Sequence, residues 1–543
     1  MRQEETLRGA GKLNWIFDID HKKDKSKKES YIFEGYNLYT SQLHPTSWMD
    51  MSEPKKVDRR KFIYAGFGAL ALIAIGAAAY VAMNPPVITQ TVITSTTVPT
   101  TSVVTTTVPT TSLITTTVPT TSVITLTEPK PEKLIFQGHE VHRKAAVGAN
   151  APGQINLIAQ FEEVTGIKVE WVTLANPENY DKLMRECSAA EATINLAHCL
   201  TTWWAPRMAN LFEQLDPWLE KAPIEEFNDF MPATLQSATI GGKLYGIPVR
   251  CSGSTMMYHK GYFEERGATP PKVIEEFYDV AKQVTFTKPS GEKVYGFSSN
   301  ANVGELYETL TWFARSWDAD LITPDYKVVC NQGPVVQALE ILAKMYRDGI
   351  TPPNFTQLQN QDHVNLVKEG RVSLFAQGVS YIITHNDPKT SKVAGQIELG
   401  YHPPAAEFKN KWEGTSPTFT YIWSMIIPKN AKYKSWSWEL IRFLSSKKSN
   451  LILSMQGTDV ARTSVYSNPQ YLEFWQKSGF PKYPDVLQKV LKYGRPPIPG
   501  MDNFSQVAQI IGTKAEEAIL GKKTAQQAMD EAAELLKPLM PKS

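Results

Sequence analysis

At 543 residues the chain is too long for one ordinary compact domain, and it is long enough to bury a large core. Its 57 basic and 55 acidic residues give a formal net charge of +2, which argues against a nucleic-acid partner and fits a neutral or small ligand. The cysteines form no C-x-x-C pair and have no His at zinc-finger spacing, which argues against a zinc ribbon or a thioredoxin-like redox site. Up to two disulfides, in three alternative pairings, can join Cys187, Cys199, Cys251 and Cys330.

Residues 62–83 form an uncharged, mainly apolar run of the length that spans ~30 Å of hydrocarbon as a helix. Five basic residues stand just before this run, and no charged residue follows until Glu128. The positive-inside rule therefore predicts that residues 1–61 are a cytoplasmic tail and that everything after residue 83 lies outside. The basic residues are Lys55, Lys56, Arg59, Arg60 and Lys61.

Three points about this N-terminal region stay open. Residues 58–63 resemble a twin-arginine export signal, or the arginines simply supply the cytoplasmic flank. Cleaved signal peptides have apolar regions of ~7 to 15 residues, so we favour an uncleaved anchor. Residues 1–50 are either a disordered tail or the product of an upstream start codon ahead of Met51, and we favour the second interpretation.

Residues 84–132 are a Thr-, Ser- and Pro-rich linker. They contain three near-copies of a ten-residue unit, which start at Thr97, Thr107 and Thr117. Such a short unit cannot bury a hydrophobic face, so the pattern predicts an extended stalk and not a repeat domain. A stalk of this kind beside a membrane helix resembles those of archaeal surface proteins.

Residues 133–543 have a globular pattern. A short apolar run at 134–136 predicts a buried strand, a helix follows up to Gly166, and alternation at 167–171 predicts a second strand. Strand, helix and strand in about forty residues make a βαβ unit with a parallel sheet. Near the other end, Thr524 and Gln527 form a capping box ahead of an amphipathic helix. The predicted fold class is α/β.

Several motifs then occur in a recognisable order. These are GGKLYGIP at 241–248, MYHK at 257–260, FE at 263–264, PPK at 270–272, LVKEGRVSLFAQG at 366–378 and IIPK at 426–429. Together they resemble the signature of maltose-binding-like extracellular solute-binding proteins over nearly all of residues 133–543. Two positions depart from it, because His259 replaces the usual Asn and residues 273–274 replace Thr-Trp. Within the family, the segments 391–395 and 461–469 are similar to sorbitol- and mannitol-type binding proteins.

The resemblance implies a type II periplasmic-binding-protein-like fold, in which two lobes joined by a hinge close on a ligand. It implies the substrate-binding subunit of an ABC importer, which takes a sugar or polyol to membrane permease subunits powered by a cytoplasmic ATPase. We expect a monomer that binds neither nucleic acid, cofactor nor metal and is not an enzyme. The N-terminal helix would hold it at the cell membrane with the binding domain outside.

Candidate ligand-binding residues follow from what a sugar requires, namely flat apolar faces and planar polar groups. Each aromatic candidate is alternatively a core residue, and we favour one of the adjacent pair Trp203 and Trp204 as the stacking surface. Each Arg is alternatively part of a structural ion pair. The sequence His139-Glu140-Val141-His142 is one residue short of zinc-protease spacing, so we assign its histidines to ligand contact and reject a protease. The candidates are Trp203, Trp204, His139, His142, Arg250, Trp317, Asp318, Tyr381, Tyr421, Trp423 and Arg462.

Other functions remain as alternatives. A receptor of the same fold could bind a peptide, an amino acid or an anion, and an Arg-rich cleft with few aromatics would indicate an anion. A surface-anchored glycoside hydrolase is a further alternative, although the chain has no G-x-S-x-G elbow, P-loop or H-E-x-x-H motif. A structural surface-layer protein is supported only by the stalk and by sequons at Asn354 and Asn503.

Overall fold

The computed structural model describes residues 128–175 and 178–541. The predicted cytoplasmic tail (1–61), membrane helix (62–83) and most of the linker (84–132) lie outside the described residues. Across the part that is described, no helix has the length and hydropathy needed to cross a membrane.

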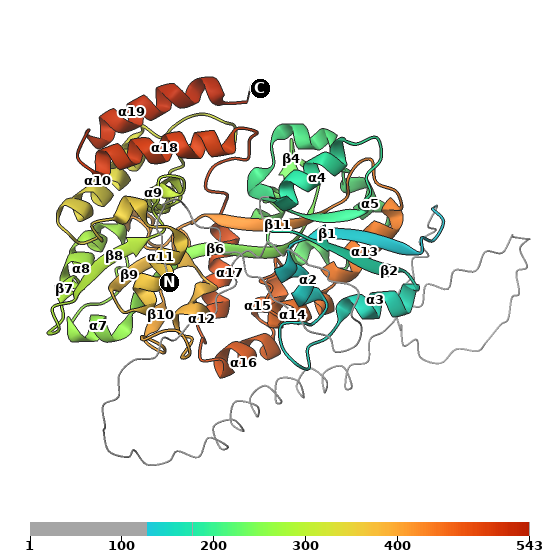
Figure 1. Ribbon diagram of the computed structural model, residues 1–543, viewed down its shortest axis with the longest axis horizontal. Helices are drawn as coiled ribbons and strands as arrows, with labels where there is room; N and C mark the ends of the chain where they lie inside the picture. The colour runs from blue at the N-terminus through green and yellow to red at the C-terminus, as the bar shows by residue number, and fades with distance from the viewer. Residues whose placement is uncertain (1–127, 176–177, 542–543) are drawn as a thin grey trace, which may run out of the picture. The chain divides into compact units, whose positions relative to one another are not determined.

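The described chain is an α/β structure built on one long mixed sheet (Figure 1). The strand order is β2-β1-β3-β11-β6-β9-β8-β7, β10 pairs with β6, and β4 and β5 form a separate small hairpin. The strands are β1 Lys133–Gly138, β2 Lys168–Thr173, β3 Leu196–Leu200, β4 Thr239–Ile240, β5 Lys243–Leu244, β6 Ile247–His259, β7 Phe286–Thr287, β8 Lys293–Ser299, β9 Val372–Gly378, β10 Ile397–Leu399 and β11 Thr420–Ile426.

Helices cover the sheet. They are α2 Glu140–Ala146, α3 Leu157–Thr165, α4 Glu178–Ser188, α5 Asp216–Lys221, α6 Pro232–Ser237, α7 Lys260–Glu265, α8 Phe277–Gln283, α9 Leu306–Ala314, α10 Gly333–Arg347, α11 Asn360–Lys368, α12 Tyr381–His385, α13 Lys434–Ser445, α14 Lys447–Met455, α15 Thr463–Tyr466, α16 Pro469–Lys477, α17 Tyr483–Tyr493, α18 Phe504–Ile519 and α19 Ala525–Leu536.

Local signals in the sequence correctly predict the first and last elements. Strands β1 and β2 pair in parallel, with α3 between them in the chain. Helix α3 ends at Gly166, whose φ of 67° is in the left-handed region that glycine adopts without strain. At the other end, Thr524 and Gln527 form the capping box of α19. The predicted βαβ unit and closing helix are confirmed.

Two strands pass between the two lobes of the sheet (Figure 1). The first part of β6, up to Gly253, pairs with β11, whereas its second part, from Ser254 onward, pairs with β9. Strand β11 joins β6 to β3 of the first lobe, with Trp423 opposite Leu200. The partner of β6 therefore changes between Gly253 and Ser254, and this change marks the junction of the lobes.

Buried apolar side chains form two large clusters. One contains the first-lobe strands β1 to β3 together with α13 and α14, and it continues across one face of the second-lobe sheet. The other lies among α8, α9, α10, α18 and α19 of the second lobe, which Figure 1 shows stacked together away from β1 and β2. One cluster thus extends through both lobes, whereas the other belongs to the second lobe alone.

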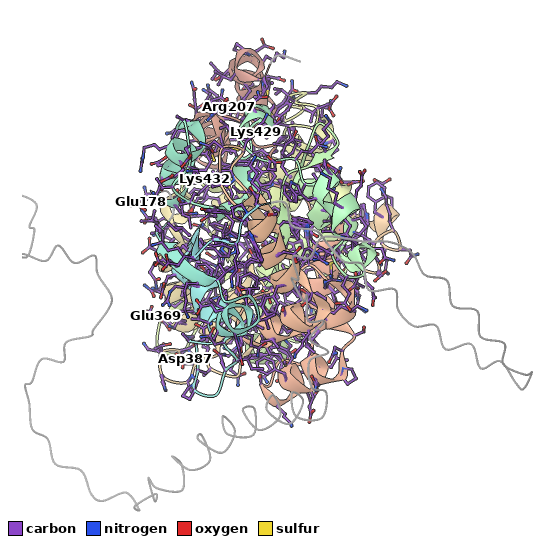
Figure 2. The ribbon with its side chains drawn as sticks, turned by 90° about the vertical axis from the view of Figure 1, so that its right-hand side faces the viewer. Glu178, Arg207, Glu369, Asp387, Lys429 and Lys432 are labelled. Atoms are coloured by element: carbon purple, nitrogen blue, oxygen red, sulfur yellow. The ribbon has the colours of Figure 1, made fainter. Side chains whose placement is uncertain are left out.

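Charged side chains of both signs share the face seen in Figure 2. Arg207, Lys429 and Lys432 lie there with Glu178 and Glu369, and all five are exposed. This mixture agrees with the balanced composition of the whole chain, and it would produce little long-range attraction for a polyanion.

Candidate functional site

A cavity of about 370 Å³ lies at the junction of the lobes, where β6 changes partner. Its size is in the range of small-molecule sites. The two Glu, the single Arg, three side-chain amides, several hydroxyls and four aromatic rings provide both polar and flat apolar contacts. The lining residues are Arg250, Ser252, Gly253, Ser254, Ser299, Asn300, Glu305, Glu308, Thr309, Trp312, Asn360, Ala376, Gln377, Gly378, Ser380, Tyr381, Phe419 and Tyr421.

The first turn of α9 supplies an acidic group to the cavity wall. The hydroxyl of Tyr307 donates to Glu308 Oε1 over 3.0 Å, and the hydroxyl of Tyr421 from β11 donates to the same oxygen. Both phenols donate to Oε1, so Oε2 keeps its hydrogen-bonding capacity for another group. Burial raises the pKa of Glu308 to about 7, although the two hydroxyl donors act in the opposite direction.

An amide network forms another part of the wall. Asn360, the first residue of α11, donates from Nδ2 to the Tyr381 hydroxyl over 2.8 Å and accepts at Oδ1 from Gln377 Nε2 over 3.1 Å. Gln377 Oε1 in turn lies 2.6 Å from His385 Nε2, which must be the donor because an amide oxygen only accepts. The Tyr381 hydroxyl accepts from Asn360 and so keeps its own proton to donate to a ligand oxygen.

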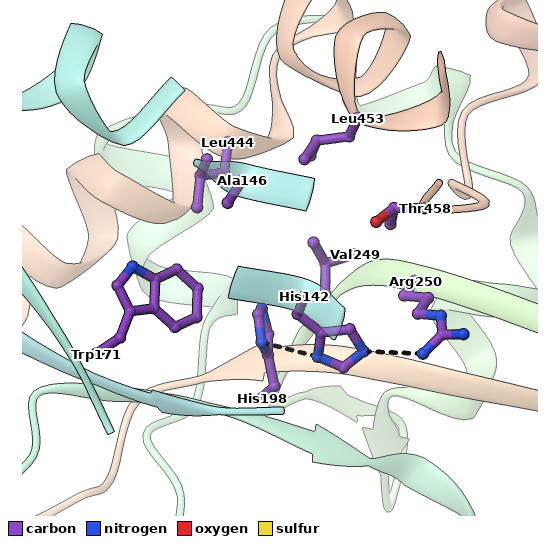
Figure 3. A pocket seen from close by; sticks show the side chains of 9 residues that line it. All are labelled: His142, Ala146, Trp171, His198, Val249, Arg250, Leu444, Leu453 and Thr458. Atoms are coloured by element: carbon purple, nitrogen blue, oxygen red, sulfur yellow. Dashed lines mark hydrogen bonds between the residues drawn. The ribbon is translucent and has the colours of Figure 1, made fainter. Parts of the chain in front are cut away.

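Arg250 lies in the middle of β6 and lines the cavity. Behind it are two histidines, which Figure 3 shows in a row with the guanidinium. Arg250 Nη1 is 3.5 Å from His142 Nε2, and His142 Nδ1 is 3.0 Å from His198 Nδ1. Burial is the main cause that lowers the pKa of His142 well below its usual value and the pKa of His198 to about 3. Both rings are therefore neutral at physiological pH.

A second, much smaller cavity of about 10 Å³ lies against the same row of residues, and it has room for about one water molecule. Trp171 and Thr458 line it together with His142, His198 and Arg250 (Figure 3). This cavity is too small for an organic ligand, so we assign ligand binding to the larger one.

The structure places three of the predicted residues in the larger cavity, namely Arg250, Tyr381 and Tyr421. Three more lie behind Arg250. His142 packs edge-on against Trp423 with ring centroids 4.8 Å apart, and His139 caps α2, where its Nδ1 accepts from the Val141 amide over 3.2 Å. His142, Trp423 and His139 thus support the wall behind Arg250 and do not line the cavity.

The predicted stacking surface at Trp203 and Trp204 requires correction. Trp204 is only 5% exposed, its Nε1 donates to Cys199 Sγ over 3.2 Å, and its ring packs edge-on against Phe212. Trp203 is half-buried against Tyr180, with ring centroids 5.2 Å apart. Neither tryptophan lines the larger cavity, because Trp204 turns into the first-lobe core and Trp203 packs on α4.

Arg462 is also corrected, because its side chain is 0% exposed. Its guanidinium donates to Asp229 Oδ2 and to the carbonyls of Glu225, Glu226 and Ser445 at 2.6 to 3.3 Å. These bonds commit the guanidinium to the first lobe, so the alternative of a structural ion pair is the correct one.

Trp317 and Asp318 lie outside the cavity lining as well. Asp318 pairs with Arg495 at 3.1 Å and with Lys411 at 2.9 Å, so its carboxylate is engaged within the second lobe. Trp317 packs partly buried against the second-lobe core. These contacts engage both side chains within the second lobe.

Several lining residues escaped sequence reasoning. Glu305 and Glu308 lie at the start of a helix in which Leu306, Tyr307 and Leu310 are buried. Gln377 is a buried polar residue in the mainly apolar strand β9. Polar side chains within apolar runs were the available signal, because a buried polar group needs a partner or a ligand.

The four cysteines are all buried, and all four are free thiols. The disulfides that the sequence allowed are therefore not part of this structure. Within residues 128–175 and 178–541, no group of three or more His, Cys, Asp or Glu side chains is arranged to hold a metal ion.

Comparison with known proteins identifies the family. Residues 156–481, more than half of the chain, match the bacterial extracellular solute-binding protein family. A binding protein of Brucella abortus is 26% identical over 239 residues, which cover 43% of this chain and 54% of that protein. The chain thus spans about half the length of the first curated relatives it matches. The erythritol/L-threitol-binding protein of Mycolicibacterium smegmatis is 22% identical over 339 residues, 57% of this chain and 68% of that protein.

The fold agrees with this assignment. The structure of maltose-bound MalE3 of T. maritima matches with a TM-score of 0.60 at 20% identity, over 75% of this chain and 99% of that one. A match at this identity shows the fold, and it confirms the predicted periplasmic-binding-protein-like architecture. The chain belongs to the bacterial extracellular solute-binding protein family, whose members are binding receptors and not enzymes.

Proposed function

We propose that the protein captures a sugar or a polyol in the cavity between its lobes and delivers it to an ABC importer. The observation that carries this proposal is the chemistry of the cavity wall, in which Glu308, Asn360, Gln377 and Tyr381 present carboxyl, amide and hydroxyl groups. These groups can donate and accept within one small volume, as a ligand with many hydroxyls requires. Relatives whose names include maltose and erythritol support the same ligand class.

The charge of the wall argues against an anion. Arg250 is the one basic residue that lines the cavity, and Glu305 and Glu308 line it too. An anion would meet one cation and two carboxyl groups, whereas a neutral polyol can accept from the cation and donate to the carboxyl groups. Four aromatic residues, including Phe419 and Tyr421, supply apolar surface for the C–H groups of a sugar.

The rest of the proposal concerns location and delivery. The family is extracellular. Residues 62–83 would anchor the chain in the cell membrane, and the linker would hold the receptor near permease subunits that a cytoplasmic ATPase drives. Tethering raises the effective concentration for docking without changing affinity for the ligand. Closure of the lobes would follow from a higher affinity of the ligand for the closed state.

The test is calorimetric titration of the purified full-length chain with alditols, mono- and disaccharides, amino acids and phosphate. We expect a polyol or sugar to bind and to raise the melting temperature, since a hundredfold excess over Kd adds about 2.7 kcal/mol of stability. Asn360→Ala should weaken binding about tenfold, because it removes an amide from the wall.

Asn331→Ala is the matched control. Asn331 also donates one side-chain hydrogen bond, to Asp530 over 2.8 Å, but it does not line the cavity. Its variant should bind as the wild type does. A response to amino acids or phosphate, with none to any carbohydrate or polyol, would refute the proposed ligand class.

A further inference from the structure

Arg250 is tied to a histidine pair outside the ligand cavity. Within the described residues, the one hydrogen bond of its side chain joins Nη1 to His142 Nε2 over 3.5 Å. A guanidinium has five N–H donors and no acceptor, so four donors remain for other groups. The side chain is half-buried at the lobe junction, where its position decides what those donors can reach.

The contacts determine which nitrogen of each ring carries the proton. Arg250 can only donate, so His142 Nε2 must be the acceptor. The proton of the neutral His142 ring is then on Nδ1, which donates to His198 Nδ1 over 3.0 Å. His198 therefore carries its proton on Nε2, an atom with no hydrogen-bond partner among the described residues.

The ring of His142 is held from several directions. Trp423 of β11 packs edge-on against it, and the His198 ring lies perpendicular to it with centroids 4.5 Å apart. His142 is 4% exposed and His198 is 2% exposed, so bulk solvent does not compete for their nitrogens. His198 is itself fixed on β3, where its backbone pairs with Met425. The acceptor that faces Arg250 is thus immobilised by the first-lobe sheet.

We propose that His142 and His198 are positioning residues, which hold the Arg250 guanidinium in the orientation that binds adjacent hydroxyls of the ligand. This inference rests on the proposed function. Neither histidine touches the ligand; both act through Arg250. Holding one donor of the guanidinium in advance lowers the cost of ordering a long side chain when ligand binds.

The first measurement needs no ligand. Nitrogen-15 chemical shifts of histidine-labelled, full-length protein distinguish the two neutral tautomers, and His142→Gln and His198→Gln assign the two signals. We expect His142 with its proton on Nδ1 and His198 with its proton on Nε2, both at neutral pH. A His142 ring with its proton on Nε2 would overturn the proposal, because that nitrogen could not accept from Arg250.

The second measurement compares three His142 variants by titration with the best polyol or sugar. A glutamine oxygen can lie near the position of Nε2, whereas an asparagine amide reaches only the position of Nδ1. We expect His142→Gln to bind within about threefold of the wild type, and His142→Asn and His142→Leu to bind about tenfold more weakly, as for loss of one hydrogen bond to a charged group. Melting temperatures without ligand separate these effects from loss of folding.

A purely structural role would affect the Asn and Gln variants alike, so equal affinities of these two would overturn the proposal. If the wild type binds and His142→Asn binds equally well, the positioning role alone is wrong. If the wild type binds no sugar or polyol, the proposed function is wrong, and this role is wrong with it.

Discussion

Replacing Glu308 by Gln should remove a defined part of the pH dependence of stability. Burial raises the pKa of this carboxyl from the usual 4.5 to about 7 in the folded protein. Between these two values the folded state holds a proton that the unfolded state has released, so the free energy of unfolding falls as the pH rises. At 1.36 kcal/mol per unit, the wild type should lose about 3 kcal/mol between pH 4.5 and pH 7.5 through this group alone.

Glutamine resembles the protonated carboxyl, and its oxygen can still accept from Tyr307 and Tyr421. Urea unfolding of both proteins across this pH range, without ligand, gives the difference in free energy between them. Asp459, whose burial raises its pKa from 3.8 to about 6, contributes in the same direction and remains in both proteins. The difference in free energy of unfolding between the two proteins therefore reports the titration of Glu308 alone. We expect the variant to equal the wild type near pH 4.5 and to be about 3 kcal/mol more stable near pH 7.5.

Glu413→Gln is the matched control, because Lys492 and Tyr493 hold the pKa of Glu413 below its usual value. Its stabilising effect is present above pH 4.5 and is lost only as the pH falls further. The Glu413→Gln protein should therefore keep the full decline of the wild type between pH 4.5 and 7.5. A Glu308→Gln protein with the same decline as the wild type would refute the reasoning about burial of this carboxyl.

Two further predictions concern structural residues. Arg462→Ala should lower the free energy of unfolding by about 3 kcal/mol or more, because it leaves Asp229 without its buried partner. Calorimetry should find an unchanged ligand Kd. A variant of normal stability and weakened binding would show that Arg462 contacts the ligand. A thiol reagent should modify no cysteine of the native protein, since burial raises the pKa of thiols such as Cys187 and Cys199 to about 12. After denaturation in guanidinium it should modify all four cysteines. Fewer than four reactive thiols in the denatured, unreduced protein would indicate a disulfide.

The parts of the fold that sequence could predict are those decided by neighbouring residues. The helix before Gly166, its end at this glycine and the capping box at Thr524 depend on contacts only a few residues apart. The long crossing strand β6 is different. Its sequence does not show that its pairing partner changes at Gly253, because the partners lie more than a hundred residues away in the chain.

The same distinction between local and long-range contacts explains which site residues the sequence could predict. Arg250 and Arg462 look equally suitable in sequence, and only the second is enclosed by carbonyls from residues 225 and 226. Trp204 is buried because Gly246 and Gly500 leave room for its ring and backbone. Burial raises the pKa of Glu308, and the Tyr421 hydroxyl that donates to it comes from a strand over a hundred residues later. Such long-range contacts determine which candidates face the cavity.

The central claim is that a ligand with several hydroxyl groups binds between the lobes at the junction of β6 and β9. A crystal structure grown with the tightest-binding sugar or polyol tests it most directly. The account predicts ligand density in the larger cavity, with hydroxyls in hydrogen-bond contact with Arg250, Glu308 Oε2 and the Tyr381 hydroxyl. Ligand bound elsewhere on the protein, with none of these three groups in contact, would contradict it.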